Sequence, residues 1–137
     1  MSDTAIEFVN VVKRYGDALA VDGISFSIAK GELVTFLGPS GCGKTTSLRL
    51  IAGLELPSEG QVLIGGRDVS RDPASDRNVG MVFQSYALFP HMNVLDNVSY
   101  GPVIRGGDKA AAQAKAREIL EQVGLSGLQD RLPSELS

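Results

Sequence analysis

Residues 38–45 read Gly-Pro-Ser-Gly-Cys-Gly-Lys-Thr, with four residues between the first and last glycine and a lysine and threonine directly after. This is the Walker A pattern. Glycines allow positive φ angles, so such a loop curls round an anion. Its N–H groups and those of the next helix then point at the same phosphate oxygens. The stretch therefore predicts a phosphate-binding loop.

A glycine-rich turn with an exposed lysine is the alternative interpretation, since the chain contains 16 glycines. From the chain's own residue frequencies, the pattern would arise by chance on the order of 1% of the time. The flanking sequence favours the loop. Residues 33–37 are short and mostly apolar, as in a buried parallel strand. Residues 44–52 have helical spacing, with Leu48, Ile51 and Ala52 on one face and Gly53 placed to end the helix.

Three side chains of this stretch have candidate roles. Lys44 would bring a positive charge to the β- and γ-phosphates, and the hydroxyl of Thr45 suits Mg²⁺. Thr46 would reach the α-phosphate by analogy. Cys42 has two open interpretations, a packing residue or a modifiable thiol in the site. The loop alone indicates a nucleoside triphosphate and leaves kinases, GTPases and transport motors open.

The rest of the first two thirds of the chain has a strand pattern. Apolar and polar residues alternate around Ile6 and Phe8 and again over residues 24–28, which predicts two half-buried antiparallel strands. Residues 61–64 and 79–83 predict two more short strands.

The last third has a helical pattern. Asn93 or Asn97 could cap a short helix, and Asp108 is placed to cap a longer one. The apolar stripe of the longer helix consists of Ala112, Ala116, Ile119, Leu120 and Val123.

Composition is that of a soluble globular protein. The 137 residues are 43% apolar and 21% charged, and the formal net charge of −3 offers no footprint for nucleic acid. No apolar run approaches the roughly 20 residues that span a bilayer. Cys42 is the single cysteine, and the first residues lack the build of a secretory signal. We therefore expect a cytoplasmic chain that reaches a membrane only through a partner.

Three further stretches narrow the class of protein. Residues 12–16 read VKRYG, residues 23–66 read GISFSIAKGELVTFLGPSGCGKTTSLRLIAGLELPSEGQVLIGG, and residues 79–101 read VGMVFQSYALFPHMNVLDNVSYG. Together they resemble the nucleotide-binding subunits of ABC transporters over essentially the whole chain. Residues 84–91, QSYALFPH, are most similar to importer motors for polyamines, sugars, sulfate and ferric iron.

The resemblance implies an α/β fold, a P-loop NTPase of the ABC type, of which the chain carries the N-terminal part. That part would comprise an antiparallel β region, the P-loop strand and helix, the Q-loop strand and most of the helical subdomain. It implies one partial ATP-binding domain over residues 1–137. Residues 1–90 would form its β-rich nucleotide-binding part, and residues 91–137 part of the helical subdomain.

The resemblance also assigns residues. Tyr15 would stack on adenine, although it could instead pack against a turn. Gln84 would be the Q-loop glutamine that senses the γ-phosphate through Mg²⁺ or the attacking water, the alternative being an edge glutamine. The cofactor-binding set is Tyr15, Gly38, Ser40, Gly41, Cys42, Gly43, Lys44, Thr45 and Thr46, with ATP and Mg²⁺ as cofactors and Thr45 and Gln84 as metal ligands.

Partners follow from the same resemblance. Residues 86–92 would receive the coupling helix of a membrane permease, unless they fill the helical subdomain core. His91 has no metal-ligand spacing around it and receives no catalytic role. A complete member would pair with a second ATP-binding subunit at the inner face of the membrane, and no nucleic acid is expected. The transported solute would be a polyamine by overall resemblance.

Residues 132–137, LPSELS, resemble the approach to the family signature Leu-Ser-Gly-Gly-Gln and contain its first two residues. Without the rest of the signature or Walker B, we expect ATP binding without efficient hydrolysis. In the family two later strands separate the P-loop and Q-loop strands, so residues 33–37 and 79–83 would be left with exposed apolar edges. A non-catalytic ATP-binding module and a non-transport ABC ATPase are the alternative functions.

Overall fold

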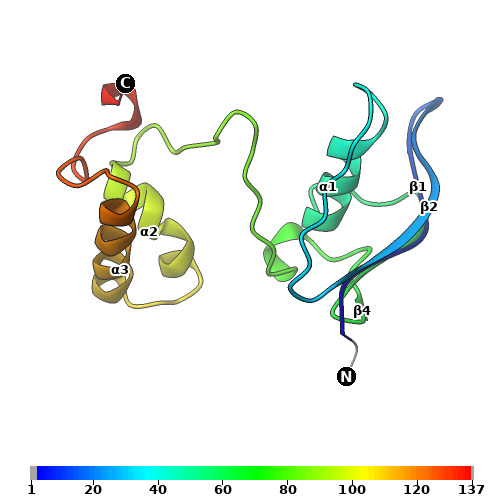
Figure 1. Ribbon diagram of the computed structural model, residues 1–137, viewed down its shortest axis with the longest axis horizontal. Coiled ribbons are helices and arrows are strands. Elements are labelled where there is room, and N and C mark those ends of the chain that lie inside the picture. Colours follow the sequence, from blue (N-terminus) through cyan, green and yellow to red (C-terminus); the bar gives the residue numbers. More distant parts are fainter. Residues whose placement is uncertain (1–2, 137) are drawn as a thin grey trace. The chain divides into compact units, whose positions relative to one another are not determined.

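The computed structural model describes residues 3–136, which divide into two compact units, residues 3–81 and residues 82–136. The first unit contains a sheet and α1 (Lys44–Ala52), and the second contains α2 (Val94–Ile104) and α3 (Lys109–Gln122), as labelled in Figure 1. Each unit has its own cluster of buried apolar side chains.

The first unit is built on a four-stranded antiparallel sheet. Its strands are β1 (Thr4–Tyr15), β2 (Ala18–Ala29), β3 (Glu59–Ile64) and β4 (Arg67–Asp68), in the order β2-β1-β3-β4. Phe8 lies opposite Phe26 of β2 and Val62 of β3, so the predicted alternation and antiparallel pairing are confirmed. Both strands of the first hairpin are longer than the pattern indicated.

The core of the first unit lies between this sheet and α1 (Lys44–Ala52). Its buried members are Phe8, Val11, Val21, Leu50, Ile51, Val62 and Val69. The predicted bounds of the helix are confirmed, and Gly53 ends it with φ of 76°. The predicted face is confirmed at Ile51 and Ala52, which are buried, and wrong at Leu48, which is exposed. Ser47 and Leu50 are buried beside Ile51, because positions i, i+3 and i+4 form one stripe.

Two predicted strands are absent from the described residues. Residues 33–37 and 79–83 have no regular secondary structure. The prediction of strands is therefore wrong for both stretches. The expected exposure of their apolar side chains is observed, since Leu33 and Val82 are 93% and 92% exposed. A strand exists through hydrogen bonds to a neighbour, and no segment within residues 3–136 pairs with either stretch.

A short 3₁₀ turn, η1 (Ala74–Asp76), follows β4 in the first unit. The second unit consists mainly of α2 (Val94–Ile104) and α3 (Lys109–Gln122), with the 3₁₀ turn η2 (Pro133–Glu135) after them. Val94, Leu95, Ala116 and Leu120 form its buried cluster.

Capping residues begin both helices of the second unit. The side chain of Asn93 accepts a bond from the N–H of Asp96, and that of Asp108 accepts one from Ala111, each at 2.8 Å. Asn97 has a different role: its amide binds the backbone of Phe89 through both its oxygen and its nitrogen, at 2.9 and 3.1 Å.

The predicted stripe of α3 is partly wrong. Ala112, Ala116 and Leu120 are buried at i, i+4 and i+8, whereas Ile119 and Val123 are exposed. Ile119 and Val123 lie on the stripe of α3 next to the one that packs against α2.

Candidate functional site

The backbone of residues 38–43 depends on glycine at particular positions. Gly41 and Gly43 have φ angles of 80° and 92°, in the left-handed region that side chains disfavour. A Cβ on Gly43 would lie 2.5 Å from the carbonyl oxygen of Ala20 in β2, and one on Gly38 would lie 2.6 Å from Cys42 Sγ. The loop is therefore packed tightly against both the sheet and itself.

Lys44 is folded over this loop. Its Nζ donates hydrogen bonds to the carbonyl oxygens of Gly38 and Pro39 at 2.6 and 2.7 Å, and lies 3.4 Å from Cys42 Sγ. These contacts hold a full positive charge beside the start of α1. Cys42 is exposed and carries a free thiol, and whether it is a packing residue or a modifiable thiol of the site stays a prediction.

The N-terminus of α1 is open. The first intrahelical bond runs from the N–H of Ser47 to Gly43 O at 2.8 Å, so the amides of residues 44–46 have no partner within the helix. Within the described chain, no side chain caps this end. The free N–H groups and the positive end of the helix dipole favour an anion here.

A cavity of about 240 Å³ lies at this helix end. Its lining residues are Ala20, Ser40, Gly41, Gly43, Lys44, Thr45 and Thr46. Apart from Ala20, all of them were predicted from the sequence. Gly38 and Cys42 do not line the cavity but contact Lys44 Nζ. Tyr15 and Gln84 are not among the lining residues either.

Tyr15 lies at the end of β1. The other strand of the first hairpin, β2, contains Ala20, the residue that Gly43 of the loop approaches. Tyr15 pairs with Ala18, two residues before Ala20, which corresponds to roughly 7 Å along the strand. The ring is exposed, and Lys13 Nζ lies 4.8 Å from its centroid. The ring is thus partly open to solvent, and whether it stacks on adenine or packs against the turn stays a prediction.

Gln84 belongs to the second unit and is exposed. The turn around it includes a bond from the N–H of Tyr86 to Phe83 O at 3.0 Å, and Tyr86 and Ala87 have φ angles of 66° and 51°. Whether Gln84 joins Lys44 and Thr45 stays a prediction.

The apolar residues after Gln84 differ in their exposure to solvent. Tyr86 and Leu88 are exposed, whereas Phe89 packs on Tyr100 with ring centroids 4.5 Å apart. His91 is exposed, and its ring centroid lies 6.2 Å from that of Phe89.

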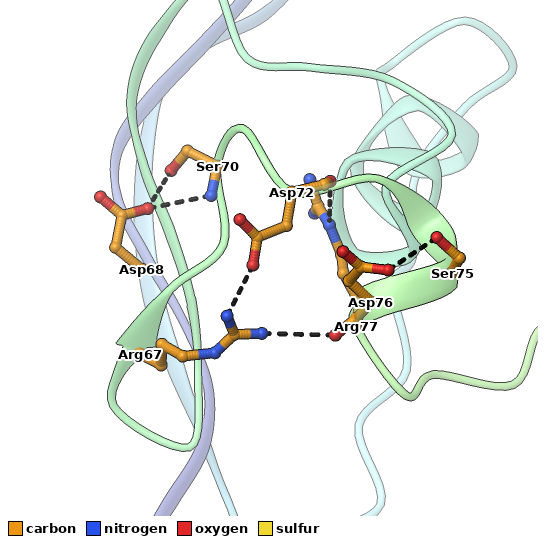
Figure 2. Close-up of polar contacts among 7 residues, drawn as sticks. All are labelled: Arg67, Asp68, Ser70, Asp72, Ser75, Asp76 and Arg77. Atoms are coloured by element: carbon orange, nitrogen blue, oxygen red, sulfur yellow. Dashed lines mark hydrogen bonds and ion pairs between the residues drawn. The ribbon is translucent and has the colours of Figure 1, made fainter.

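Sequence reasoning missed Arg77, which is 3% exposed. Its Nη1 donates to the carbonyls of Leu50 and Ile51 at 2.6 and 3.3 Å, and its Nε to Asp72 O at 2.9 Å (Figure 2). Arg77 therefore binds the C-terminal carbonyls of the helix whose other end carries Lys44. Burial lowers the pKa of the Arg77 guanidinium, and the charges of Asp72 and Asp68 oppose that shift.

The carboxylate of Asp68 lies in the same neighbourhood (Figure 2). It accepts bonds from the hydroxyl and the N–H of Ser70 at 2.5 and 2.9 Å, and these bonds lower the pKa of Asp68. Replacing Ser70 with alanine should raise that pKa toward its ordinary value, which a carboxyl NMR titration measures.

The sign of the pH effect follows from the lowered pKa. The ionised Asp68 stabilises the fold above its unfolded-state pKa, and this contribution disappears as pH falls through the folded-state pKa. The stability cost of Ser70→Ala should therefore shrink in acid. Ser75→Ala, which removes a hydroxyl bonded to Asp76 at 2.8 Å, is the control and should leave the pKa of Asp68 unchanged. An unchanged Asp68 pKa in Ser70→Ala would contradict the assignment.

Comparison with known proteins decides the family. The family model described as ABC transporter matches residues 21–137, which is most of the chain. The chain belongs to the ABC transporter family. The predicted recognition and fold class are thereby confirmed, with the chain carrying the N-terminal part of an ABC-type P-loop NTPase fold.

Two curated relatives in the family are Fe(3+) ions import ATP-binding proteins named FbpC. The protein from Agrobacterium fabrum (strain C58) is 57% identical over 133 residues, covering 97% of this chain and 38% of the relative. The one from Escherichia coli (strain K12) is 50% identical over 132 residues, covering 96% and 38%. The chain thus spans 38% of the length of these relatives.

Solved ABC cassettes share the fold. A dimeric ATP-binding cassette in a post-hydrolysis state, bound to ADP and Pi, is 29% identical with a TM-score of 0.84, covering 96% of this chain and 63% of that one. An ATP-binding cassette of an ABC transporter is 28% identical with a TM-score of 0.80, covering 99% and 60%. Among the residues described in this chain, no helix is long and apolar enough to cross a membrane.

Proposed function

We propose that this chain binds ATP with Mg²⁺ and forms part of the ATP-binding subunit of an ABC importer. The observation that carries the proposal is the cavity at the uncapped N-terminus of α1, where Lys44 lies beside free amides and two threonine hydroxyls. Such a site favours a polyphosphate, because the positive helix end and the ammonium act on the same anion.

Each residue of the site has a proposed role. The amides from Gly41 to Thr46 would bind phosphate oxygens, and Lys44 would neutralise the β- and γ-phosphates. Thr45 would ligate Mg²⁺, which prefers one or two protein ligands together with waters and substrate phosphates. That preference suits a site where, among residues 3–136, no group of three acidic, cysteine or histidine side chains gathers. Tyr15 would stack on adenine, and Gln84 would sense the γ-phosphate.

We infer binding without efficient hydrolysis from the composition of the cavity. None of its described lining residues is an aspartate or glutamate. Attack of water on the γ-phosphate requires groups that orient the water and hold the metal, and carboxylates usually supply them. In this chain the loop would therefore retain ATP rather than turn it over.

The setting of the site is proposed from the relatives. We expect a membrane permease and a second ATP-binding subunit as partners, at the cytoplasmic face of the membrane. The names of the curated relatives favour ferric iron as the solute. Nothing observed supports the polyamine prediction over iron.

The proposal is tested by titrating ATP with Mg²⁺ into the chain by calorimetry. Lys44→Met should weaken binding about 10- to 150-fold, because a charge-assisted contact contributes about 1.5 to 3 kcal/mol. Lys30→Met, which removes an equal charge from an exposed turn, is the matched control and should leave the affinity nearly unchanged. Absence of binding, or equal affinity of the wild type and Lys44→Met, would disprove the proposed function.

A further inference from the structure

We propose that Lys13 and Glu55 are positioning residues that hold the ring of Tyr15 in place and leave one of its faces for the nucleotide base. This inference rests on the proposed function, in which Tyr15 stacks on adenine. It assigns a role to an ion pair that lies outside the phosphate cavity.

Lys13 makes three contacts at once. Its Nζ forms an ion pair with Glu55 Oε2 at 2.9 Å, donates to Leu56 O at 2.9 Å, and lies 4.8 Å from the ring centroid of Tyr15. The side chains of Lys13 and Glu55 are only 13% and 25% exposed, so solvent screens the pair weakly. A lysine with its donors occupied in this way has little rotamer freedom left.

The carboxylate of Glu55 is shared between Lys13 and Tyr15. Its pKa lies below the ordinary value, first because Lys13 hydrogen-bonds to it and also because Tyr15 does, although burial acts in the opposite direction. The ammonium therefore restrains the ring from one face, and the carboxylate restrains its hydroxyl.

These contacts connect the end of β1, which carries Tyr15, to the segment after α1, the helix that begins at the phosphate loop. Lys13 and Tyr15 are two residues apart on β1 and share a face of the strand, while Glu55 and Leu56 lie three and four residues after the last residue of α1, Ala52. The end of β1 is thus fastened to the segment that follows the phosphate-binding helix. The ammonium covers one face of the ring, so a base can stack only on the other. A ring held in advance loses less entropy on binding.

The test compares two ligands, ATP and inorganic tripolyphosphate, by calorimetry with Mg²⁺. We expect Lys13→Met and Glu55→Gln each to weaken ATP binding about 3- to 10-fold, since a ring that is no longer held in place keeps only part of its stacking on the base. Tripolyphosphate has no base, so its affinity should change less than about twofold, which also shows that each variant is folded.

The two variants separate positioning from simple electrostatics. Lys13→Met removes a positive charge and Glu55→Gln a negative one, so a purely electrostatic effect would shift ATP affinity in opposite directions. Positioning predicts that both weaken it. Lys115→Met, which breaks the exposed ion pair with Glu118 on α3, is the control and should change neither affinity.

The outcomes that overturn the inference are distinct from failure of the proposed function. Unchanged ATP affinity, opposite shifts in the two variants, or equal loss of both ligands would each overturn the positioning role. A wild-type chain that binds neither ATP nor tripolyphosphate would instead remove the proposed function, and the inference with it.

Discussion

Replacing Arg77 with methionine is expected to lower the free energy of unfolding of the first unit by about 3 to 5 kcal/mol. Methionine keeps the length of the side chain but cannot donate hydrogen bonds. The carbonyls of Leu50 and Ile51 would lose a partner in a buried site and that of Asp72 in a partly buried one, and each buried unpaired group costs about 1 to 3 kcal/mol. Removing a buried charge offsets part of this cost. Urea unfolding followed by circular dichroism measures the loss.

Arg67 provides the matched control for this prediction. It lies in the same neighbourhood and pairs with Asp72 at 2.8 Å, but its side chain is 62% exposed (Figure 2). Arg67→Met should cost less than about 1 kcal/mol, because exposed ion pairs contribute little. Equal losses in the two variants would show that the buried contacts to α1 are unimportant.

Replacing Gly60 with alanine is expected to destabilise the first unit by about 3 kcal/mol. Gly60 has a φ angle of 80°, and its Cβ would lie 2.2 Å from the carbonyl oxygen of Asn10 in β1. Asn10 cannot easily move away, because its N–H donates to Ser25 Oγ at 2.8 Å and its side chain accepts from the same hydroxyl at 3.1 Å. The register between β1 and β3 already shifts at this place.

Gly65→Ala separates the clash from the backbone strain. Gly65 also has a positive φ angle, 58°, but a Cβ there would meet nothing within 4 Å. Its replacement should cost only about 1 kcal/mol, from the left-handed conformation alone. Thermal unfolding of both variants checks the difference. If Gly60→Ala is no worse than Gly65→Ala, the close approach of β1 is not what requires glycine.

Local patterns in the sequence predicted the elements whose causes are local. The alternation around Phe8 and Phe26 predicted the first hairpin, Gly53 predicted the end of α1, and Asp108 predicted the start of α3. In each case the reason lies within a few residues, in side-chain periodicity or in a cap. The loop residues that line the cavity, Ser40, Gly41 and residues 43–46, were predicted in the same way, because their pattern is contiguous.

The features that sequence reasoning missed depend on distant partners. Residues 33–37 and 79–83 have strand-like composition, but a ladder needs a neighbour that composition does not report. Arg77 bonds to Leu50, 27 positions earlier, and nothing in its own surroundings indicates burial. The link from Lys13 to Glu55 is of the same kind. Gly53 is consistent with a close neighbour, because a Cβ there would lie 2.5 Å from Arg77 Nε, but the sequence does not identify that neighbour.

The central place of β1 has a consequence for local opening. This strand is hydrogen-bonded to β2 on one side and β3 on the other, whereas residues 33–37 pair with nothing described. Amide protons should therefore exchange with solvent slowest in β1 and fastest just before Gly38. The phosphate loop therefore follows the segment with the fastest expected exchange, whereas Tyr15 ends the strand with the slowest. A nucleotide would then meet a base platform that is already rigid and a loop that it must itself order.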